Sequence, residues 1–356
     1  MARPRWIATI LMLGALAATA CSNDQAGDEP HPDDPIGTPR VIAEHLHVPW
    51  GVVFLPGGDA VVGERTTGML LRIGAGGRIH RIGKVPGAID RGEGGLLGLA
   101  LSPSYRDDRL LYAYFTSGTD NRVVRFTLRG DTIGPEQPVF TGIEAAPIHD
   151  GGRIAFGPDG LLYVAVGDAS DGDVAQNPNA PNGKILRLTP DGKPAPGNPR
   201  PGSPVYTLGH RNPQGLAWGP KNRLYQVEFG QDKFDEINLL HPGGNYGWPI
   251  VEGDVKDDRF TRPLVTWPTS EASPSGVAYA NGALWVGALR GERLYRVPVH
   301  DDGTLGRPES LLTGRYGRIR TVVVAPDHSL WLTTSNRDGR GSPAAADDRI
   351  IRVPMH

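Results

Sequence analysis

Residues 154–163 have the sequence IAFGPDGLLY, in which apolar residues lead into a Pro-Asp-Gly turn and a second apolar run follows. This order is typical of a β-hairpin. The same order of apolar run and turn begins at five other places, at residues 52, 99, 216, 277 and 322. The copies recur every ~45 to 62 residues, which is the spacing of propeller blades.

Further short strands are expected between these hairpins, over residues 69–73, 122–127 and 293–297, which gives about four strands per repeat. The sequence therefore predicts an all-β fold, a six-bladed β-propeller with four-stranded antiparallel blades over residues 41–356. We expect the ring to close where the two ends of the folded chain meet. A β-sandwich with incidental hairpins is the alternative, but sandwiches do not usually repeat one arrangement in this way.

Charge and composition narrow the class of protein. The 356 residues contain 37 Lys and Arg against 39 Asp and Glu, a net charge of −2. This balance argues against a nucleic-acid-binding protein, which usually carries a basic surplus. The 49 glycines and 33 prolines, set among regular apolar runs, indicate many tight turns.

The sole cysteine, Cys21, excludes an intrachain disulfide and a cysteine-based metal site. Arginines, an apolar run over 6–16 and small residues over 17–20 precede it, so residues 1–20 are expected to be a lipoprotein signal peptide and Cys21 to be acylated. Residues 21–40, rich in Asp and Pro, would form a flexible tether. This predicts an exported protein held on the extracytoplasmic side of the cell membrane by a lipid. The alternative is an ordinary secretory signal with an incidental cysteine.

Propeller sites lie at one mouth of the channel and draw on loops of several blades. His149 precedes the first strand of the third hairpin, and Asp168 follows its second strand. The hairpin brings both to one end, where a carboxylate can orient an imidazole that acts as a general base. A single His beside Gly is more often structural, and the pairing with Asp168 favours the catalytic interpretation.

Four arginines occupy comparable positions in the later blades. They are Arg211, Arg290, Arg318 and Arg320. Converging guanidinium groups suggest a ligand with several negative charges, such as a polycarboxylate. The turn over 229–232 offers backbone carbonyls that could ligate a hard cation such as calcium. The glycines around Glu93, over 92–98, are not followed by a helix, so a nucleotide-binding loop is not predicted.

Four segments together resemble the glucose/sorbosone dehydrogenase family, which includes the PQQ-dependent aldose sugar dehydrogenases. They are residues 94–100 (GGLLGLA), 209–216 (GHRNPQGL), 235–238 (DEIN) and 245–249 (NYGWP). The resemblance covers about residues 48–353. It implies a six-bladed propeller that oxidises an aldose at its anomeric carbon to the lactone, with pyrroloquinoline quinone (PQQ) and calcium as cofactors. His149 would take the proton of the anomeric hydroxyl, and hydride would pass to the quinone.

The resemblance also implies roles for single residues. Asp168 would orient His149, and Arg211, also counted as catalytic, would grip the quinone edge with Asn212. The other residues expected at the cofactor are Arg290, Arg318, Arg320, Trp267 and Thr269. Those expected at the substrate are Glu93 and Asp150, and calcium would lie on the carbonyls of Gly230 and Gln231.

This sequence departs from the family pattern at four positions. Glu93 stands where Gln is usual, Arg290 where Lys is usual, Gln231 where Pro is usual, and Leu264 near a substrate-lining Tyr. The sequence does not identify the sugar or the electron acceptor, and a homodimer is possible. Two other functions remain open, a non-catalytic propeller that binds a carbohydrate or another partner, and a lactonase-type hydrolase that would need carboxylates around calcium.

Overall fold

The computed structural model describes residues 1–2 and 34–356 of the chain, and a compact unit extends over Pro35–His356. Apart from residues 1–2, the predicted signal peptide lies outside the described residues, and so does the acylation site Cys21. Within the described part, no helix is long and apolar enough to cross a membrane.

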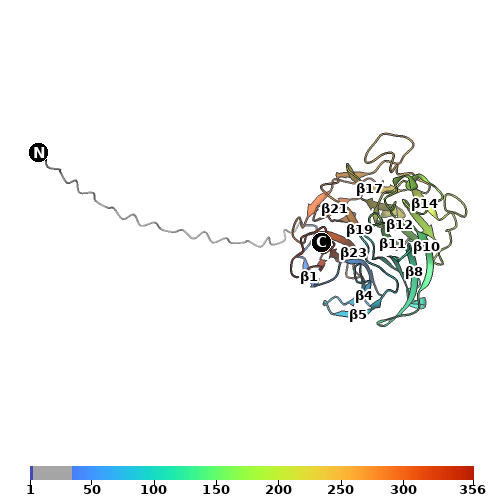
Figure 1. The fold of residues 1–356 in the computed structure, drawn as a ribbon, viewed down its shortest axis with the longest axis horizontal. Coiled ribbons are helices and arrows are strands. Elements are labelled where there is room, and N and C mark those ends of the chain that lie inside the picture. The colour runs from blue at the N-terminus through green and yellow to red at the C-terminus, as the bar shows by residue number, and fades with distance from the viewer. Residues whose placement is uncertain (3–33) are drawn as a thin grey trace. The chain divides into compact units, whose positions relative to one another are not determined.

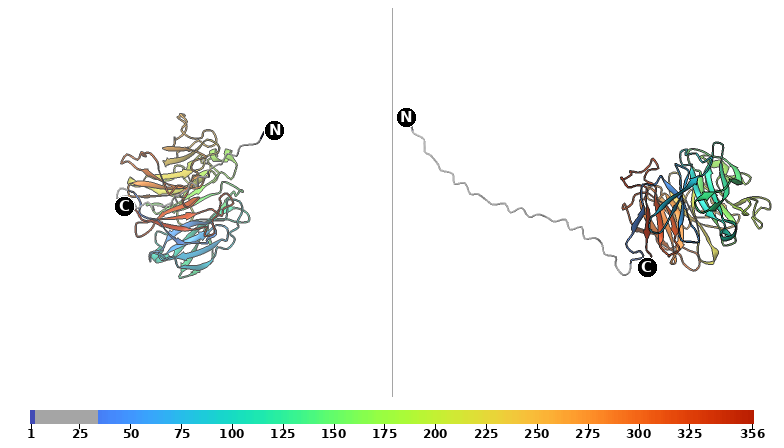
Figure 2. Two further views of the ribbon diagram at one scale, coloured as in Figure 1. Left: turned by 90° about the vertical axis from the view of Figure 1, so that its left-hand side faces the viewer. Right: turned by 90° about the horizontal axis from the view of Figure 1, so that it is seen from below.

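Six antiparallel sheets radiate around a common centre, as predicted (Figures 1 and 2). In chain order the first blade contains β2 (Pro49–Phe54), β3 (Ala60–Glu64), β4 (Met69–Ile73) and β5 (Ile79–Lys84). The second contains β6 (Leu96–Leu101), β7 (Leu110–Thr116), β8 (Asn121–Arg129) and β10 (Gln137–Ile143), with the short β9 (Thr132–Ile133) beside β8. The third contains β11 (Gly151–Phe156), β12 (Leu162–Val166), β13 (Lys184–Leu188) and β14 (Val205–Leu208).

The fourth and fifth blades repeat this pattern. Their strands are β15 (Pro213–Trp218), β16 (Leu224–Glu228), β17 (Phe234–Leu240) and β18 (Val265–Pro268), then β19 (Pro274–Ala280), β20 (Ala283–Ala288), β21 (Arg293–Pro298) and β22 (Glu309–Leu311). The described helices are short, α1 (Tyr105–Asp108), η1 (Gly172–Gln176) and η2 (Pro220–Asn222). The first strand of each blade packs beside the first strand of the next, which encloses the channel.

The sixth blade closes the ring with strands from both ends of the folded unit. It contains β23 (Ile319–Val324), β24 (Leu330–Thr334), β25 (Ile350–Val353) and the N-terminal β1 (Arg40–Ala43), which pairs with β25. Ile36 bridges Met355 and is buried against this blade. The predicted tether over 21–40 is therefore too long, because its last residues belong to the folded unit and contribute an apolar side chain to the core.

The core consists of apolar wedges between neighbouring blades. One example lies between the sixth and first blades, where Phe54 meets Trp331 edge to face with ring centroids 5.0 Å apart. Aromatic pairs of this kind add about 0.5–1.5 kcal/mol beyond the burial of their area. Since packing between blades holds the ring, the loops and strand ends at the channel mouth are available for polar groups.

Candidate functional site

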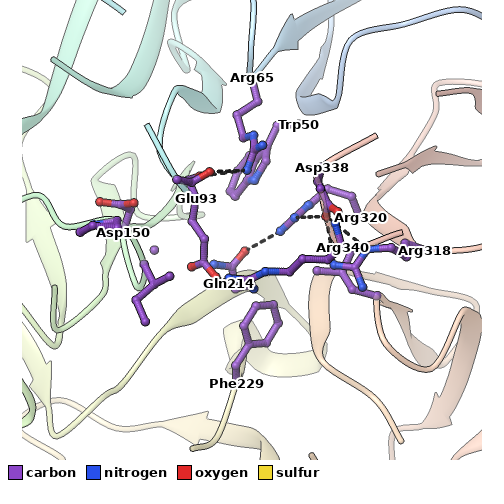
Figure 3. Close-up of a pocket in the computed structure, with 16 residues that line it drawn as sticks. Trp50, Arg65, Glu93, Asp150, Gln214, Phe229, Arg318, Arg320, Asp338 and Arg340 are labelled. Atoms are coloured by element: carbon purple, nitrogen blue, oxygen red, sulfur yellow. Dashed lines mark hydrogen bonds and ion pairs between the residues drawn. The ribbon is translucent and has the colours of Figure 1, made fainter. Parts of the chain in front are cut away.

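Two adjoining cavities lie at the end of the channel where the innermost strands begin. The Arg320 cavity, about 370 Å³, is lined among others by Trp50, Arg65, Asp150, Gln214, Arg320 and Asp338 (Figure 3). The His149 cavity, about 500 Å³, is lined among others by His149, Arg211, Asn212, Gly230, Gln231 and Arg290. Both cavities share six lining residues, namely Glu93, Ile148, Phe229, Leu289, Arg318 and Arg340. All six blades therefore contribute polar groups to one mouth.

His149 and Asp168 meet at the open end of the β11–β12 hairpin. Pairing of Gly151 with Val166 sets the register, and His149 Nδ1 lies 2.7 Å from Asp168 Oδ1. Asp168 is 1% exposed and His149 is 7% exposed. The contact between His149 and Asp168 that the hairpin predicts is therefore present.

The backbone around this pair is held in an unusual conformation. His149 has φ of 67°, and Ala169 and Ser170, directly after Asp168, have φ of 53° and 66°. Left-handed conformations of non-glycine residues each cost on the order of 1–2 kcal/mol and cluster at functional sites. The fold therefore fixes both sides of the His149–Asp168 contact.

Glu93 connects the second blade to three other elements. Its carboxylate accepts hydrogen bonds from the His149 backbone N–H (2.9 Å) and from Asn212 Nδ2 (3.2 Å), and it pairs with Arg340 Nη1 at 2.7 Å. Burial acts to raise the pKa of Glu93, but the His149 N–H and the Arg340 guanidinium outweigh it and leave the pKa below its ordinary value. Glu93 thus places a negative charge between the two cavities.

Asp150 is a buried carboxyl in the wall of the Arg320 cavity. Its Oδ1 accepts hydrogen bonds from Asn121 Nδ2 (2.8 Å) and the Ala146 N–H (3.4 Å). In the described part of the chain its buried Oδ2 has no hydrogen-bond partner. Burial raises the pKa of Asp150 to about 6, against the opposing effect of the two hydrogen bonds.

Arg318 and Arg320 gather around one carboxylate. Asp338 Oδ2 lies 3.0 Å from Arg318 Nη2 and 3.4 Å from Arg320 Nη2, and Figure 3 shows this group facing Glu93 across the cavity. Arg320 Nη1 also donates to Gln214 Oε1 at 3.3 Å. Burial lowers the pKa of Arg320 to about 10. One carboxylate cannot neutralise two guanidinium groups, so this side of the mouth keeps a positive charge.

Other arginines near the mouth have no acidic partner within ion-pairing distance anywhere in residues 34–356. Arg211 donates to Gln231 Oε1, Arg290 to the Thr269 carbonyl, and Arg65 to the carbonyls of Gly92 and Glu93. Arg153, deeper in the channel, lies over the Trp50 ring at 4.0 Å, and burial lowers its pKa to about 9. Uncompensated guanidinium groups beside cavities of this size fit a small ligand with several carboxylates.

The loop at Gly230 can offer backbone oxygens. A side chain at Gly230 would collide with the Phe234 carbonyl at 1.8 Å, so only glycine allows this close approach. Glu252 Oε1 accepts the backbone N–H groups of residues 231–234 and holds the turn. The carbonyls of Gly230 and Gln231 accept no hydrogen bond in the part that the structure describes. Across that part, no group of three or more His, Cys, Asp or Glu is arranged to hold a metal. A calcium ion here would therefore be held by these carbonyls and by oxygen atoms of a molecule bound in the cavity.

The structure brings together most of the residues singled out from the sequence, with two exceptions. Trp267 is buried in the wedge between the fourth and fifth blades, against Tyr295 at 5.0 Å, and lines neither cavity. Its strand β18 turns this side chain into the apolar wedge, while Thr269 just beyond lines the His149 cavity, and the expectation that Trp267 lies beside a cofactor stays a prediction. Leu264 also lies outside the lining of both cavities.

Sequence reasoning missed several residues of the mouth. They are Trp50, Arg65, Trp248, Asp338 and Arg340. Asp338 and Arg340 follow the second strand of the last inner hairpin, as Asp168 follows that of the third blade, but at four and six residues beyond the strand end instead of two. Their place in the loop after this strand was the available signal, since strand ends of successive blades meet at one mouth.

Comparisons with known proteins agree with this geometry. The family model described as Glucose / Sorbosone dehydrogenase matches residues 46–351. The PQQ-bound form of aldose sugar dehydrogenase from Streptomyces coelicolor superposes with a TM-score of 0.87 at 50% identity, over 89% of this chain and 97% of that one. Aldose sugar dehydrogenase YliI of Escherichia coli is 29% identical over 84% of this chain and 90% of its own length. Quinoprotein glucose dehydrogenase B of Acinetobacter calcoaceticus is 34% identical over 68% of this chain, a match that spans 55% of that protein.

A family match across nearly the whole propeller, with relatives aligned over most of the chain, shows that this chain belongs to the glucose/sorbosone dehydrogenase family.

Proposed function

We propose that the chain is a PQQ- and calcium-dependent aldose dehydrogenase that oxidises the anomeric carbon of a sugar to a lactone. The observation that carries the proposal is the buried His149–Asp168 pair beside a cavity that Arg211 and Arg290 line without acidic partners. A base and a polyanion-binding surface at one mouth are what this reaction needs. The PQQ-bound relative from Streptomyces coelicolor supports the choice of cofactor.

His149 is proposed as the general base. The Asp168 carboxylate can only accept, and its Oδ1 also accepts the Ser170 N–H at 2.8 Å, so His149 Nδ1 carries the hydrogen of their contact. In the neutral ring Nε2 is then left without a hydrogen and can take the proton of the anomeric hydroxyl. Asp168 stabilises the charge that develops on the ring.

The arginines are proposed to hold the cofactor. Arg318 and Arg320 would bind its carboxylates, Arg290 and Thr269 would border it, and Arg211 with Asn212 would face its quinone edge. The bound quinone supplies the acceptor for the hydride, that is, for the two electrons removed from the anomeric carbon. The carbonyls of Gly230 and Gln231 would hold calcium beside Arg211.

Glu93 and Asp150 are proposed to face the sugar. Glu93 keeps a charged carboxylate where it also fixes the His149 backbone, and Asp150 offers an unpartnered oxygen in the wall of the Arg320 cavity. A sugar presents many hydroxyl donors, which such acceptors bind well.

Reconstitution tests the proposal. The purified full-length protein is mixed with PQQ and calcium and assayed for dye reduction with a panel of aldoses, and lactone is identified by mass spectrometry. His149→Gln serves as the matched variant, expected to bind PQQ but to lose turnover by roughly 10²–10⁴-fold. Absence of turnover with every sugar, together with no change in PQQ absorbance on mixing, would instead identify a non-catalytic binding protein.

We also propose export and lipid anchoring through Cys21, on the grounds of the sequence around it. Membrane fractionation and mass spectrometry of the N-terminal peptide test this. The wild type should partition with membranes and carry acyl chains, whereas Cys21→Ser should be released as protein without acyl chains. A wild-type N-terminus without lipid would contradict the proposal.

A further inference from the structure

We propose that Trp248 is a positioning residue, which orients the candidate base His149 through the carboxylate of Asp168. The indole Nε1–H of Trp248 donates to Asp168 Oδ2 at 2.7 Å, while Oδ1 faces His149. In the described part of the chain Trp248 is the only hydrogen-bond donor to Oδ2. A chain of three side chains, Trp248, Asp168 and His149, therefore runs from the fourth blade to the mouth.

Trp248 is held in place by its backbone. Its N–H donates to the Gly209 carbonyl at 3.0 Å, and its carbonyl accepts from Gln176 Nε2 at 2.6 Å. Gln176 is also joined to Asn245 through both atoms of its amide. The loop that follows β17 is thus tied to η1 of the third blade, and the indole cannot swing away from Asp168 without breaking these contacts.

The contact has a directional consequence, because an indole nitrogen can only donate. It therefore requires Oδ2 to be an acceptor and fixes the rotation of the carboxylate, which leaves Oδ1 aligned with His149 Nδ1. Without the indole donor, Oδ2 would be buried and unsatisfied, and the carboxylate would gain freedom to rotate. The carboxylate would then turn out of contact with His149 part of the time, and rings that lose this contact would no longer be held in the Nδ1–H tautomer, so the fraction of rings with an unprotonated Nε2 would fall.

Trp248 also touches the cofactor side of the mouth. The Arg211 guanidinium lies over its ring, 5.4 Å from the centroid. A substitution that keeps the ring and removes the N–H separates the two contacts. Trp248→Phe is that variant, since Phe retains a face for Arg211 and lacks a donor for Asp168.

The test compares Trp248→Phe with Trp218→Phe, both as full-length protein. Trp218 packs edge to face on Tyr163 at 5.2 Å, and its indole N–H makes no hydrogen bond in the described structure. In the cofactor-free proteins, nitrogen NMR of the His149 ring reports the tautomer, and this measurement does not depend on the proposed function. We expect a single Nδ1–H tautomer in the wild type and Trp218→Phe, and a mixture in Trp248→Phe.

The kinetic arm rests on the proposed function. With PQQ, calcium and an aldose, Trp248→Phe should lower kcat on the order of tenfold to hundredfold, with KM and PQQ affinity unchanged. A wild-type His149 spectrum in Trp248→Phe overturns the proposal, and so does a defect confined to PQQ affinity. Should Trp248→Phe fail to fold, the NMR signals of the indole N–H groups are compared between the wild type and Asp168→Asn. One of these signals should shift in the variant, because the acceptor of the Trp248 N–H has changed. Identical indole spectra would overturn the proposal.

Discussion

Glu93 Oε1 and Arg340 Nη1 lie 2.7 Å apart and join the second blade to the sixth across the channel mouth. Arg340 is exposed over 56% of its side chain, so solvent screens the pair and it contributes little to stability, about 0–1 kcal/mol. Its importance is electrostatic. Glu93 places a negative charge in the lining of both cavities, among arginines suited to an anionic ligand.

Replacing Glu93 with Gln should therefore strengthen PQQ binding by roughly tenfold, because a repulsive charge leaves a partly buried site. Fluorescence titration of PQQ into the protein measures this. The control is Glu309→Gln on the outer strand β22, which breaks a surface pair with Arg296 of β21 and should leave the affinity unchanged. Weaker binding in Glu93→Gln would mean that the hydrogen bonds of Glu93 to His149 and Asn212 matter more than its charge.

Asp168→Asn should leave PQQ binding intact and reduce kcat by roughly 10³–10⁴-fold. The Asn side chain has an NH2 donor as well as a carbonyl acceptor. When the NH2 group faces His149 Nδ1, it favours the tautomer in which Nε2 carries the hydrogen and cannot act as a base. Steady-state kinetics with saturating PQQ measure the effect. Retention of full turnover would remove His149 and Asp168 from the mechanism.

Contacts within a hairpin could be predicted from the sequence, whereas contacts between distant blades could not. The repeated turn phrase predicts the strands, and antiparallel pairing of β11 with β12 then places His149 beside Asp168. Nothing in the sequence indicates that Trp248, 80 positions after Asp168, donates to it, because that contact depends on the path of a long loop.

The direction of side chains at strand ends is a second feature that the sequence pattern does not predict. Trp267 and Thr269 stand two residues apart, yet one fills an apolar wedge and the other lines the His149 cavity. Ile36 shows that composition alone can also misplace the boundary of the folded unit. It lies in a segment whose composition resembles a tether, but the ring needs β1 to close, and the residues that lead into β1 pack with it.

Asp150 predicts a pH-dependent difference in stability. Its pKa is raised by burial to about 6 in the folded protein, from an ordinary value of 3.8. Between these values the folded state binds more protons than the unfolded state, so the contribution of Asp150 to the free energy of unfolding falls as pH rises and levels off above pH 6. Asp150→Asn removes this loss of stability at high pH. Above pH 6 the variant should be more stable than the wild type by about 1–3 kcal/mol, and below pH 3.8 it should have no such advantage.

Urea denaturation at a series of pH values measures the difference between Asp150→Asn and the wild type, in which the contributions of other titrating groups cancel. Asp131→Asn, which breaks a surface pair with Arg72, is the matched control for the loss of a carboxylate outside the channel mouth. A constant difference across the whole range would show that the carboxyl does not change its protonation on folding.

Asp338 is the counter-charge of Arg318 and Arg320, and its removal should make the cofactor-free protein less stable while strengthening its affinity for an anionic ligand. Both guanidinium groups are nearly buried, and loss of their shared partner should lower the free energy of unfolding by about 3 kcal/mol. Added PQQ would supply carboxylates in place of Asp338, so it should raise the stability of Asp338→Asn more than that of the wild type.

Denaturation with and without PQQ measures both quantities, and Asp327→Asn, which breaks the outer pair with Arg352, controls for loss of an ion pair elsewhere. Equal stabilisation of Asp338→Asn and wild type by PQQ would place the carboxylates of the cofactor away from Arg318 and Arg320.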